Sequence, residues 1–151
     1  MIRAALQAEP IDVVAVIADA QAEGAGAIAT FSGIVRDDDG VTALELEHYP
    51  AMTESVMQAL AEEAAKRWSL LSVRVVHRVG RMVPGETVVL VVTVAPHRHE
   101  ALEACAFLID LLKSETPFWK REWRGEAGAW VEPRQSDDRA LARWREHPAG
   151  N

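Results

Sequence analysis

Apolar side chains recur along the chain with two spacings, and the spacing of three or four residues predicts three helices. Residues 97–113 carry apolar positions along one face of an amphipathic helix, at Ala101, Ala104, Cys105, Leu108, Ile109 and Leu112. Residues 53–68 repeat this spacing, with Thr53 as the expected N-cap. Residues 10–24 form a shorter candidate, with a proline near its start and a glycine at its end.

The second spacing, together with runs of β-branched residues, predicts strands. Residues 87–95 are apolar almost throughout and are expected to form a central strand, joined to residues 71–79 by a turn that holds a proline and a glycine. Residues 41–49 alternate apolar and polar side chains and are expected to form a hairpin with residues 25–36. A closing hairpin is expected after residue 117.

Helices and mainly antiparallel strands are thus mixed without regular βαβ alternation, which favours a single α+β domain over residues 1–151. A polar tail is expected from about residue 136 to residue 151. The formal net charge of -7 argues against a nucleic-acid partner, because the phosphate backbone rewards a basic surface. No apolar stretch is long enough to span a membrane, and no secretory signal precedes the domain, so a cytoplasmic location away from membranes is expected.

The richest candidate chemistry lies in residues 113–122, which read Lys-Ser-Glu-Thr-Pro-Phe-Trp-Lys-Arg-Glu. Lys113 falls one turn beyond Ile109, on the edge of the apolar stripe of the long helix. Pro117 cannot continue that helix, so Phe118 to Lys120 should leave as an extended segment. Two lysines facing one partly apolar cleft would be desolvated, which suits an amine to act as proton donor, base or nucleophile. The alternative is a pair of solvated lysines, one of them favoured by the helix dipole.

Three further residues are candidates for anion binding. Arg36 follows a predicted strand and is suited to bidentate contact with phosphate or carboxylate, although a solvated arginine at a strand end fits the pattern equally well. His97 and Arg98 begin the long helix, where free N–H groups and the dipole favour anions. The spacing of His97 and His99 is not that of a zinc site. Arg98 and Lys113 lie roughly 24 Å apart along the helix, so they could share a small-molecule site only across a two-fold dimer.

Six segments in a fixed order carry a resemblance to a known family. They are residues 30–36, 46–50 with 52–53, 77–80, 96–98, 113–122, and 130–132 with 136–137. Together they resemble the large, catalytic subunit of molybdopterin synthase, over most of the chain from about Gly24 to Asp137. This resemblance implies an α/β-hammerhead-like fold and an enzyme that needs no metal or other cofactor.

The resemblance also implies a reaction and its partners. The family converts cyclic pyranopterin monophosphate, or precursor Z, into molybdopterin by installing the two dithiolene sulfurs. Each sulfur arrives as a thiocarboxylate on the C-terminal Gly-Gly of a small ubiquitin-like sulfur-carrier subunit. Two large subunits form a homodimer, with one small subunit at each outer end. The single cysteine, Cys105, is expected in the core and not as a sulfur carrier.

By similarity, Lys113 lies at the thiocarboxylate and acts in acid/base or transient acyl chemistry, and Lys120 assists beside the pterin. The other residues expected to bind substrate are Ile34, Val35, Arg36, Arg121, Glu122 and Arg134, with His97 and Arg98 supplied by the other chain. The residues expected to shape the pocket walls are Phe31, Phe118 and Trp119.

The sequence departs from the family pattern at two places. The turn at residues 37–40 is shorter than the usual loop, which bears on how the substrate is covered. Pro96 replaces a small residue before His97 and Arg98, which bears on the pose of His97.

The sequence is also compatible with two other functions. One is a dimer that binds an anion without turnover, and the other is a structural partner of a ubiquitin-like protein in which Phe118 and Trp119 anchor the interface.

Overall fold

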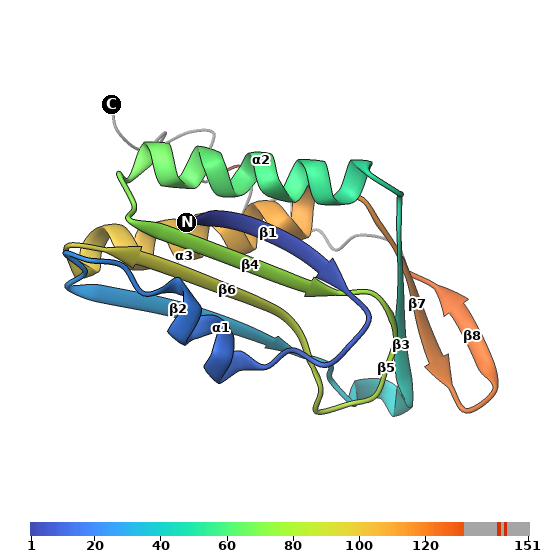
Figure 1. The fold of residues 1–151 in the computed structure, drawn as a ribbon. Helices are drawn as coiled ribbons and strands as arrows, with labels where there is room; N and C mark the ends of the chain where they lie inside the picture. Colours follow the sequence, from blue (N-terminus) through green and yellow to red (C-terminus); the bar gives the residue numbers. More distant parts are fainter. Residues whose placement is uncertain (132–141, 143, 145–151) are drawn as a thin grey trace.

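Two four-stranded β-sheets organise the molecule (Figure 1). The structure is a computed structural model, and it describes residues 1–131, 142 and 144. The first sheet contains, in spatial order, β1 (Ile2–Gln7), β4 (Ser72–Arg78), β6 (Thr87–Ala95) and β2 (Ala27–Ile34). The second sheet contains β5 (Gly80–Met82), β3 (Ala43–His48), β7 (Phe118–Arg124) and β8 (Ala127–Trp130). Of the pairings between these strands only β1 with β4 is parallel, so the predicted mainly antiparallel arrangement is confirmed.

Helices cover both faces of the first sheet (Figure 1). The helical segments of the described chain are α1 (Val13–Ala20), the short 3-10 helix η1 (Asp38–Gly40), α2 (Met52–Arg67) and α3 (Arg98–Glu115). α2 and α3 pack on one face, where Val75 and Val91 belong to their core cluster, and α1 packs on the other face against Leu90 and Val92. Side chains alternate between the faces of a strand, so the apolar run of β6 fills both layers. The predicted central position of this strand is confirmed.

The predicted hairpin between residues 25–36 and 41–49 is wrong. β2 pairs with β6 in the first sheet, whereas β3 pairs with β5 and β7 in the second sheet. The connection contains η1, where Asp39 and Gly40 adopt positive φ angles of 57° and 73°, and it carries the chain from one sheet to the other. Alternation of side chains shows which face of a strand is buried, but it does not specify the partner strand.

β1 is a strand that the sequence patterns did not predict. It runs parallel to β4, with Ile2 opposite Val73 and Gln7 opposite Arg78. Its middle contains two alanines, which are depleted in strands, and none of its central residues is β-branched or aromatic, so no local pattern marked it. The strand forms because the buried β4 offers an open edge, a long-range effect that a reading of local periodicity does not capture.

The starts of two helices differ from the sequence-based expectation. α1 begins at Val13, and Asp12 is its N-cap, with the carboxylate accepting a hydrogen bond from the Ala15 N–H at 3.1 Å. The predicted N-cap role of Thr53 is wrong, because α2 begins at Met52 and Thr53 lies inside its first turn. The hydroxyl of Thr53 instead bonds to backbone outside the helix.

Within the predicted polar tail, the structure describes residues 142 and 144, and Trp144 belongs to the core. Trp144 is 5% exposed, and its ring lies against Trp68 and Phe107, at centroid distances of 5.9 and 5.5 Å. Its indole N–H donates to the Asp110 carboxylate at 2.7 Å.

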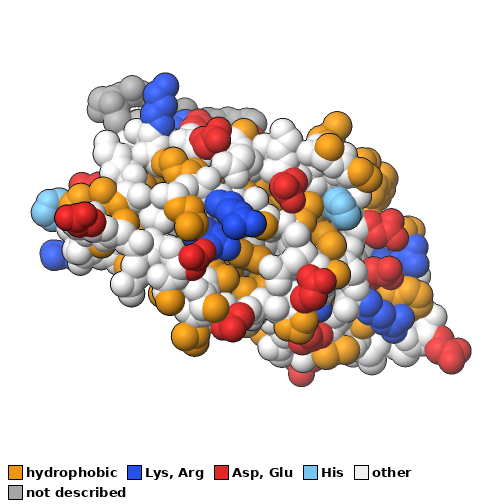
Figure 2. Space-filling model, viewed as in Figure 1, with side chains coloured by type: hydrophobic (Ala, Val, Ile, Leu, Met, Phe, Trp, Pro, Cys, Tyr) orange, Lys and Arg blue, Asp and Glu red, His pale blue; other side chains and the backbone are white. Residues whose placement is uncertain are grey.

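None of the helices in residues 1–131 is long and apolar enough to cross a membrane. On the face shown in Figure 2, acidic and basic side chains are interspersed.

Candidate active site

Residues 113–120, called here the two-lysine turn, connect the end of α3 to the start of β7. α3 ends at Glu115, and Thr116 is already extended, with φ and ψ of -80° and 124°. Pro117 follows, and β7 begins at Phe118. The predicted helix end and extended exit are therefore confirmed. Lys113 is exposed and Lys120 is half-buried. Of the three lysines in the whole sequence, two flank this turn.

The two faces of β7 separate its side chains into different surroundings. Phe118 and Lys120 share one face, because alternate residues of a strand point the same way. This is the inner face: Phe118 packs against the apolar cluster of Val35, Leu46 and Met82, and Leu46 is the residue opposite Lys120 in the pairing of β3 with β7. Lys120 therefore extends beside apolar side chains, whereas Lys113 is exposed, so within one subunit only Lys120 has the apolar surroundings that the cleft hypothesis expects of both lysines.

Trp119 and Arg121 point to the outer face of the second sheet. The Trp119 ring is 50% exposed and lies 5.9 Å from both Tyr49 and Trp130. The Arg121 guanidinium lies 4.1 Å from the centroid of the Trp130 ring and 4.0 Å from the Glu45 carboxylate. Within one subunit, these two residues thus do not share a surface with Phe118 and Lys120.

The end of β2 reaches the same apolar cluster from the first sheet. Val35 is 5% exposed and belongs to that cluster, so the flanking Ile34 and Arg36 are held near the start of β7. Ile34 and Arg36 are exposed, and the Arg36 guanidinium lies 3.4 Å from the Asp38 carboxylate. The N–H of Val35 donates to the Glu86 carbonyl at 2.9 Å, so this N–H is already paired.

Phe31 and Gly33 shape the inner part of β2. Phe31 is half-buried and packs against the main core cluster, as Phe118 also does. A side chain at position 33 would come within 2.6 Å of the Val89 side chain and 3.3 Å of the Phe31 ring. Glycine is required here because two side chains close over its backbone. Phe31 and Phe118 are thus the two predicted wall residues that face the core.

His77 joins the site although sequence analysis gave it no role. It is 9% exposed on β4, and its ring stacks on Phe118 with centroids 4.3 Å apart and planes at 30°. Its Nδ1 lies 2.8 Å from the Arg78 carbonyl, which can only accept, so Nδ1 carries the proton. Burial, with a smaller contribution from the charge of Lys113, lowers the pKa of His77 to about 4, so the ring is neutral near pH 7. The feature of the sequence that could have identified His77 is a histidine inside an otherwise largely apolar predicted strand.

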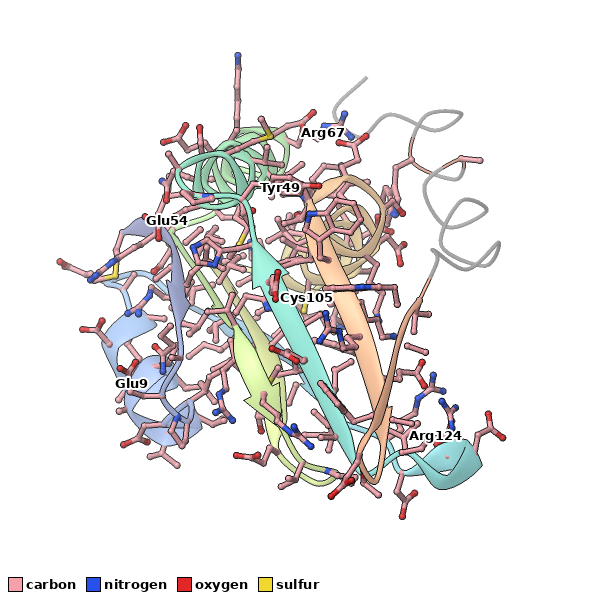
Figure 3. The ribbon with its side chains drawn as sticks, turned by 90° about the vertical axis from the view of Figure 1, so that its right-hand side faces the viewer. Glu9, Tyr49, Glu54, Arg67, Cys105 and Arg124 are labelled. Atoms are coloured by element: carbon pink, nitrogen blue, oxygen red, sulfur yellow. The ribbon has the colours of Figure 1, made fainter. Side chains whose placement is uncertain are left out.

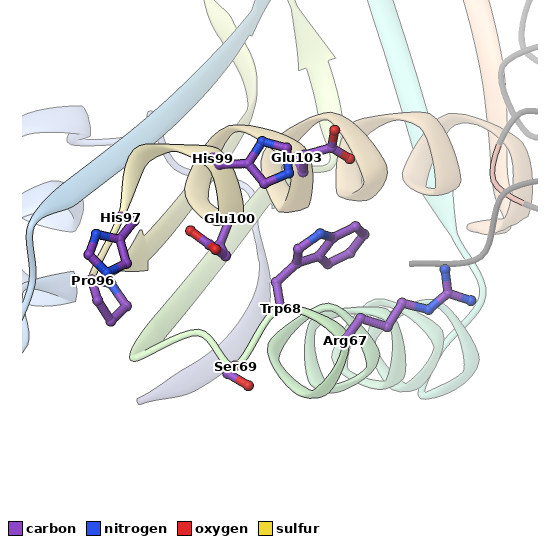
Figure 4. A pocket seen from close by; sticks show the side chains of 8 residues that line it. All are labelled: Arg67, Trp68, Ser69, Pro96, His97, His99, Glu100 and Glu103. Atoms are coloured by element: carbon purple, nitrogen blue, oxygen red, sulfur yellow. The ribbon is translucent and has the colours of Figure 1, made fainter. Parts of the chain in front are cut away.

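His97 and Arg98 lie at the opposite end of α3 from Lys113, as predicted. His97 is the N-cap, its side chain makes no capping bond, and α3 begins at Arg98. Both residues are exposed. A depression of about 520 Å³ lies between the end of α2 and the start of α3 (Figure 4), and it is lined by Arg67, Trp68, Ser69, Pro96, His97, His99, Glu100 and Glu103. Within one subunit, this end and the two-lysine turn form separate surfaces.

The remaining candidates have other surroundings. Glu122 shares the inner face of β7 with Lys120 and lies 3.5 Å from the Arg124 guanidinium. Arg134 lies outside the described residues. Cys105 is 7% exposed in the core, and burial raises the pKa of its thiol to about 11. This thiol is protonated near neutral pH and is a weak nucleophile. Among the residues that the structure describes, no three His, Cys, Asp or Glu side chains are grouped to hold a metal ion.

Comparison with known proteins gives a consistent result. Residues 6–115 match the family described as MoaE protein. The molybdopterin synthase catalytic subunit of Cereibacter sphaeroides is 49% identical over 146 residues, which cover 94% of this chain and 99% of that protein. The solved structure of molybdopterin cofactor biosynthesis protein E from Burkholderia multivorans superposes with a TM-score of 0.83 at 44% identity, covering 96% of this chain and 97% of that one.

A more distant structure adds a likeness of fold. A protein-protein complex of subunits 1 and 2 of the molybdopterin-converting factor from Helicobacter pylori contains a chain that matches with a TM-score of 0.76. The two chains are 24% identical, and the match covers 87% of this chain and 91% of that one. The α+β fold is therefore shared across these proteins.

Proposed function

The chain belongs to the MoaE family of molybdopterin synthase catalytic subunits, which convert precursor Z to molybdopterin, and from this premise we propose that Lys113 and Lys120 carry the sulfur transfer. The observation that carries this proposal is the two-lysine turn. The break at Pro117 puts the two lysines on either side of a turn, and Lys120 shares the inner face of β7 with Phe118. An ammonium group held beside apolar side chains, as that of Lys120 is, stabilises negative charge more strongly than it does in water.

The proposed sulfur donor is a small ubiquitin-like subunit with a C-terminal Gly-Gly thiocarboxylate. The Helicobacter pylori complex, which contains a chain of the same fold, supports a two-subunit assembly. In each transfer the thiocarboxylate sulfur forms a bond to a carbon of the pterin, and this carbon loses a C–O bond, whose oxygen leaves as water or stays on the phosphate. Water then cleaves the bond between the acyl carbon and the sulfur, and the tail leaves as a carboxylate. Lys113 stabilises the charge on the acyl oxygen or takes the acyl group transiently.

The proposed substrate contacts come from two subunits. Arg36 is exposed at the end of β2, near the start of β7, and its guanidinium suits the phosphate of precursor Z. His97 and Arg98 are at the far end of α3, so they would reach this phosphate only from a second copy of the chain. The proposal therefore includes a homodimer whose sites are completed across the subunit interface. The cytoplasmic location expected from the sequence stays a prediction.

The test is conversion of precursor Z by the chain together with a thiocarboxylated small subunit. Lys113→Ala is expected to lower turnover by about 100-fold or more, because one preorganised donor at a developing charge is worth about that factor. Lys66→Ala is the matched control, because Lys66 is exposed on α2 and is the only other lysine. Binding of the small subunit should survive both changes. Undiminished turnover by Lys113→Ala would contradict the proposal.

A further inference from the structure

Two buried polar side chains, Thr53 and His77, hold the two-lysine turn from its inner side. Each belongs to a segment that carried the family resemblance, and neither was expected to act in the reaction. Thr53 bonds to the backbone of Pro117, and His77 stacks on the ring of Phe118. Pro117 and Phe118 lie in the segment between the two lysines, just before Trp119 and Lys120. The two contacts therefore fix the part of the chain that sets how the lysines lie relative to each other.

The Thr53 hydroxyl completes the pairing of β3 with β7 at a point where the backbone alone does not. The pairing of His48 with Phe118, continued by one residue, brings Tyr49 opposite Pro117. Thr53 Oγ1 accepts from the Tyr49 N–H at 2.8 Å and donates to the Pro117 carbonyl at 2.8 Å. One hydroxyl thus bridges the two strands. Figure 3 shows Tyr49 where β3 runs into α2.

The helix that carries Thr53 is firmly placed. Thr53 itself is fully buried, and the next turn of α2 contributes Met57 and Leu60 to the main core cluster, at 0% and 5% exposure. The Thr53 N–H also donates to the Tyr49 carbonyl at 3.1 Å. The position of the Thr53 hydroxyl is therefore set by the core. If the two-lysine turn shifted, the hydroxyl could not move with it, and the hydrogen bond to Pro117 would be lost.

His77 is equally fixed beneath Phe118. It lies in β4 between two strands, opposite Leu6 of β1 and Val89 of β6. The hydrogen bond from Nδ1 to the Arg78 carbonyl, 2.8 Å long, sets the orientation of the ring. A flat ring stacked at 4.3 Å supports the whole face of Phe118, two residues before Lys120 on the same face of β7.

We propose that Thr53 and His77 are positioning residues for sulfur transfer, which set the placement of Lys120 relative to Lys113 by fixing Pro117 and Phe118. The proposal rests on the function proposed above. Neither side chain touches the reacting atoms in this account. Loss of either contact lets the turn shift, and a displacement of about 1 Å at a catalytic group costs on the order of 100-fold in rate. The loss should appear in kcat and leave the binding of the small subunit unchanged.

The decisive variant is Thr53→Val, which keeps the shape of the side chain and removes the hydroxyl. We expect kcat for precursor Z conversion to fall by about 10- to 100-fold, with KM for precursor Z little changed. Thr53→Ser keeps the hydroxyl and should restore most of the lost kcat. Ser72→Ala is the control, because Ser72 is 1% exposed and its hydroxyl also donates to a backbone carbonyl, that of Met1, at 3.1 Å. It should leave kcat unchanged.

A wild-type kcat in folded Thr53→Val would overturn the proposal, as would a loss that Thr53→Ser does not restore. If Thr53→Val does not fold, the His77 variants decide. His77→Phe keeps a flat ring against Phe118, whereas His77→Leu removes it, so the leucine variant should lose more kcat; equal values would overturn the proposal. Undiminished turnover in Lys113→Ala identifies a failure of the proposed function itself, since the positioning variants leave both lysines in place.

Discussion

The two ends of α3 are built differently. At its C-terminal end, the two-lysine turn is held by a buried hydroxyl, a buried histidine and an apolar cluster, all from the same subunit. At its N-terminal end, His97 and Arg98 are exposed beside an open depression, and the His97 side chain makes no capping bond. A turn fixed from within suits a group that must be preorganised for a reaction, whereas an open surface suits residues that act on a neighbouring subunit's substrate.

The largest expected effect is at the C-terminal end of α3, called here the fixed end, in contrast to the open end at His97 and Arg98. Lys120→Ala should lower kcat by about 100-fold, because it removes a preorganised cation from the inner face of β7. Arg98→Ala at the open end should mainly raise KM for precursor Z, since it removes binding and leaves the lysines in place. Steady-state kinetics with a thiocarboxylated small subunit would measure both. The contrast between the two ends would be lost if the two variants changed kcat and KM alike.

A smaller effect should appear in the acid stability of the fixed end. His77 has a pKa of about 4 in the folded protein and about 6.5 when unfolded, so the unfolded chain binds a proton in this range that the folded chain does not. The resulting stability is fully present above pH 6.5 and is lost as the pH falls to about 4. This loss amounts to about 3 kcal/mol.

Denaturant unfolding at pH 7 and pH 4 would measure this contribution. His77→Phe has no titrating ring and should lose about 3 kcal/mol less than the intact chain between these values. Lys113 is the charged group whose proximity adds to the shift, so Lys113→Ala should shrink the loss slightly. An identical pH dependence in the intact chain and His77→Phe would show that the histidine is not held neutral under Phe118.

The smallest expected effect concerns Arg36. Its ion pair with Asp38 is exposed, with 57% and 52% of the two side chains accessible, and such pairs are weak. Asp38→Asn frees the guanidinium for the phosphate and should lower KM for precursor Z by about 2-fold at low salt, with kcat unchanged. The difference should shrink in high salt, because exposed charges are screened. A KM that is raised would show that Asp38 helps to bind substrate.

Sequence patterns predicted the features of the fold that depend on residues close together in the chain. The end of α3 followed from Pro117, which cannot continue a helix, and the central position of β6 followed from its apolar run. The partner of β3 and the existence of β1 did not follow, because both depend on pairings with strands far away in the sequence. The two lysines were visible as candidates, since they lie seven residues apart around a proline.

The supporting residues were hidden for the same reason. Thr53 had the signature of an N-cap, and only the tertiary fold shows that its hydroxyl bonds to Tyr49 and Pro117. His77 sat in an apolar run, and its stacking on Phe118 joins residues of two different sheets. Trp119 and Arg121 were grouped with Phe118 and Lys120 by sequence position, yet strand alternation separates them onto opposite faces.

The most direct test of the account is a subunit-mixing experiment with Lys113→Ala and Arg98→Ala chains. Assayed at a precursor Z concentration near the KM of the intact enzyme and well below the raised KM of Arg98→Ala, each homodimer alone should convert little substrate, because every site lacks one of the two residues. A 1:1 mixture after subunit exchange should regain roughly a quarter of the intact turnover, since half of the dimers are mixed and each mixed dimer has one complete site. A mixture no more active than its parents, with exchange verified, would contradict a site shared between the two ends of α3 from different subunits.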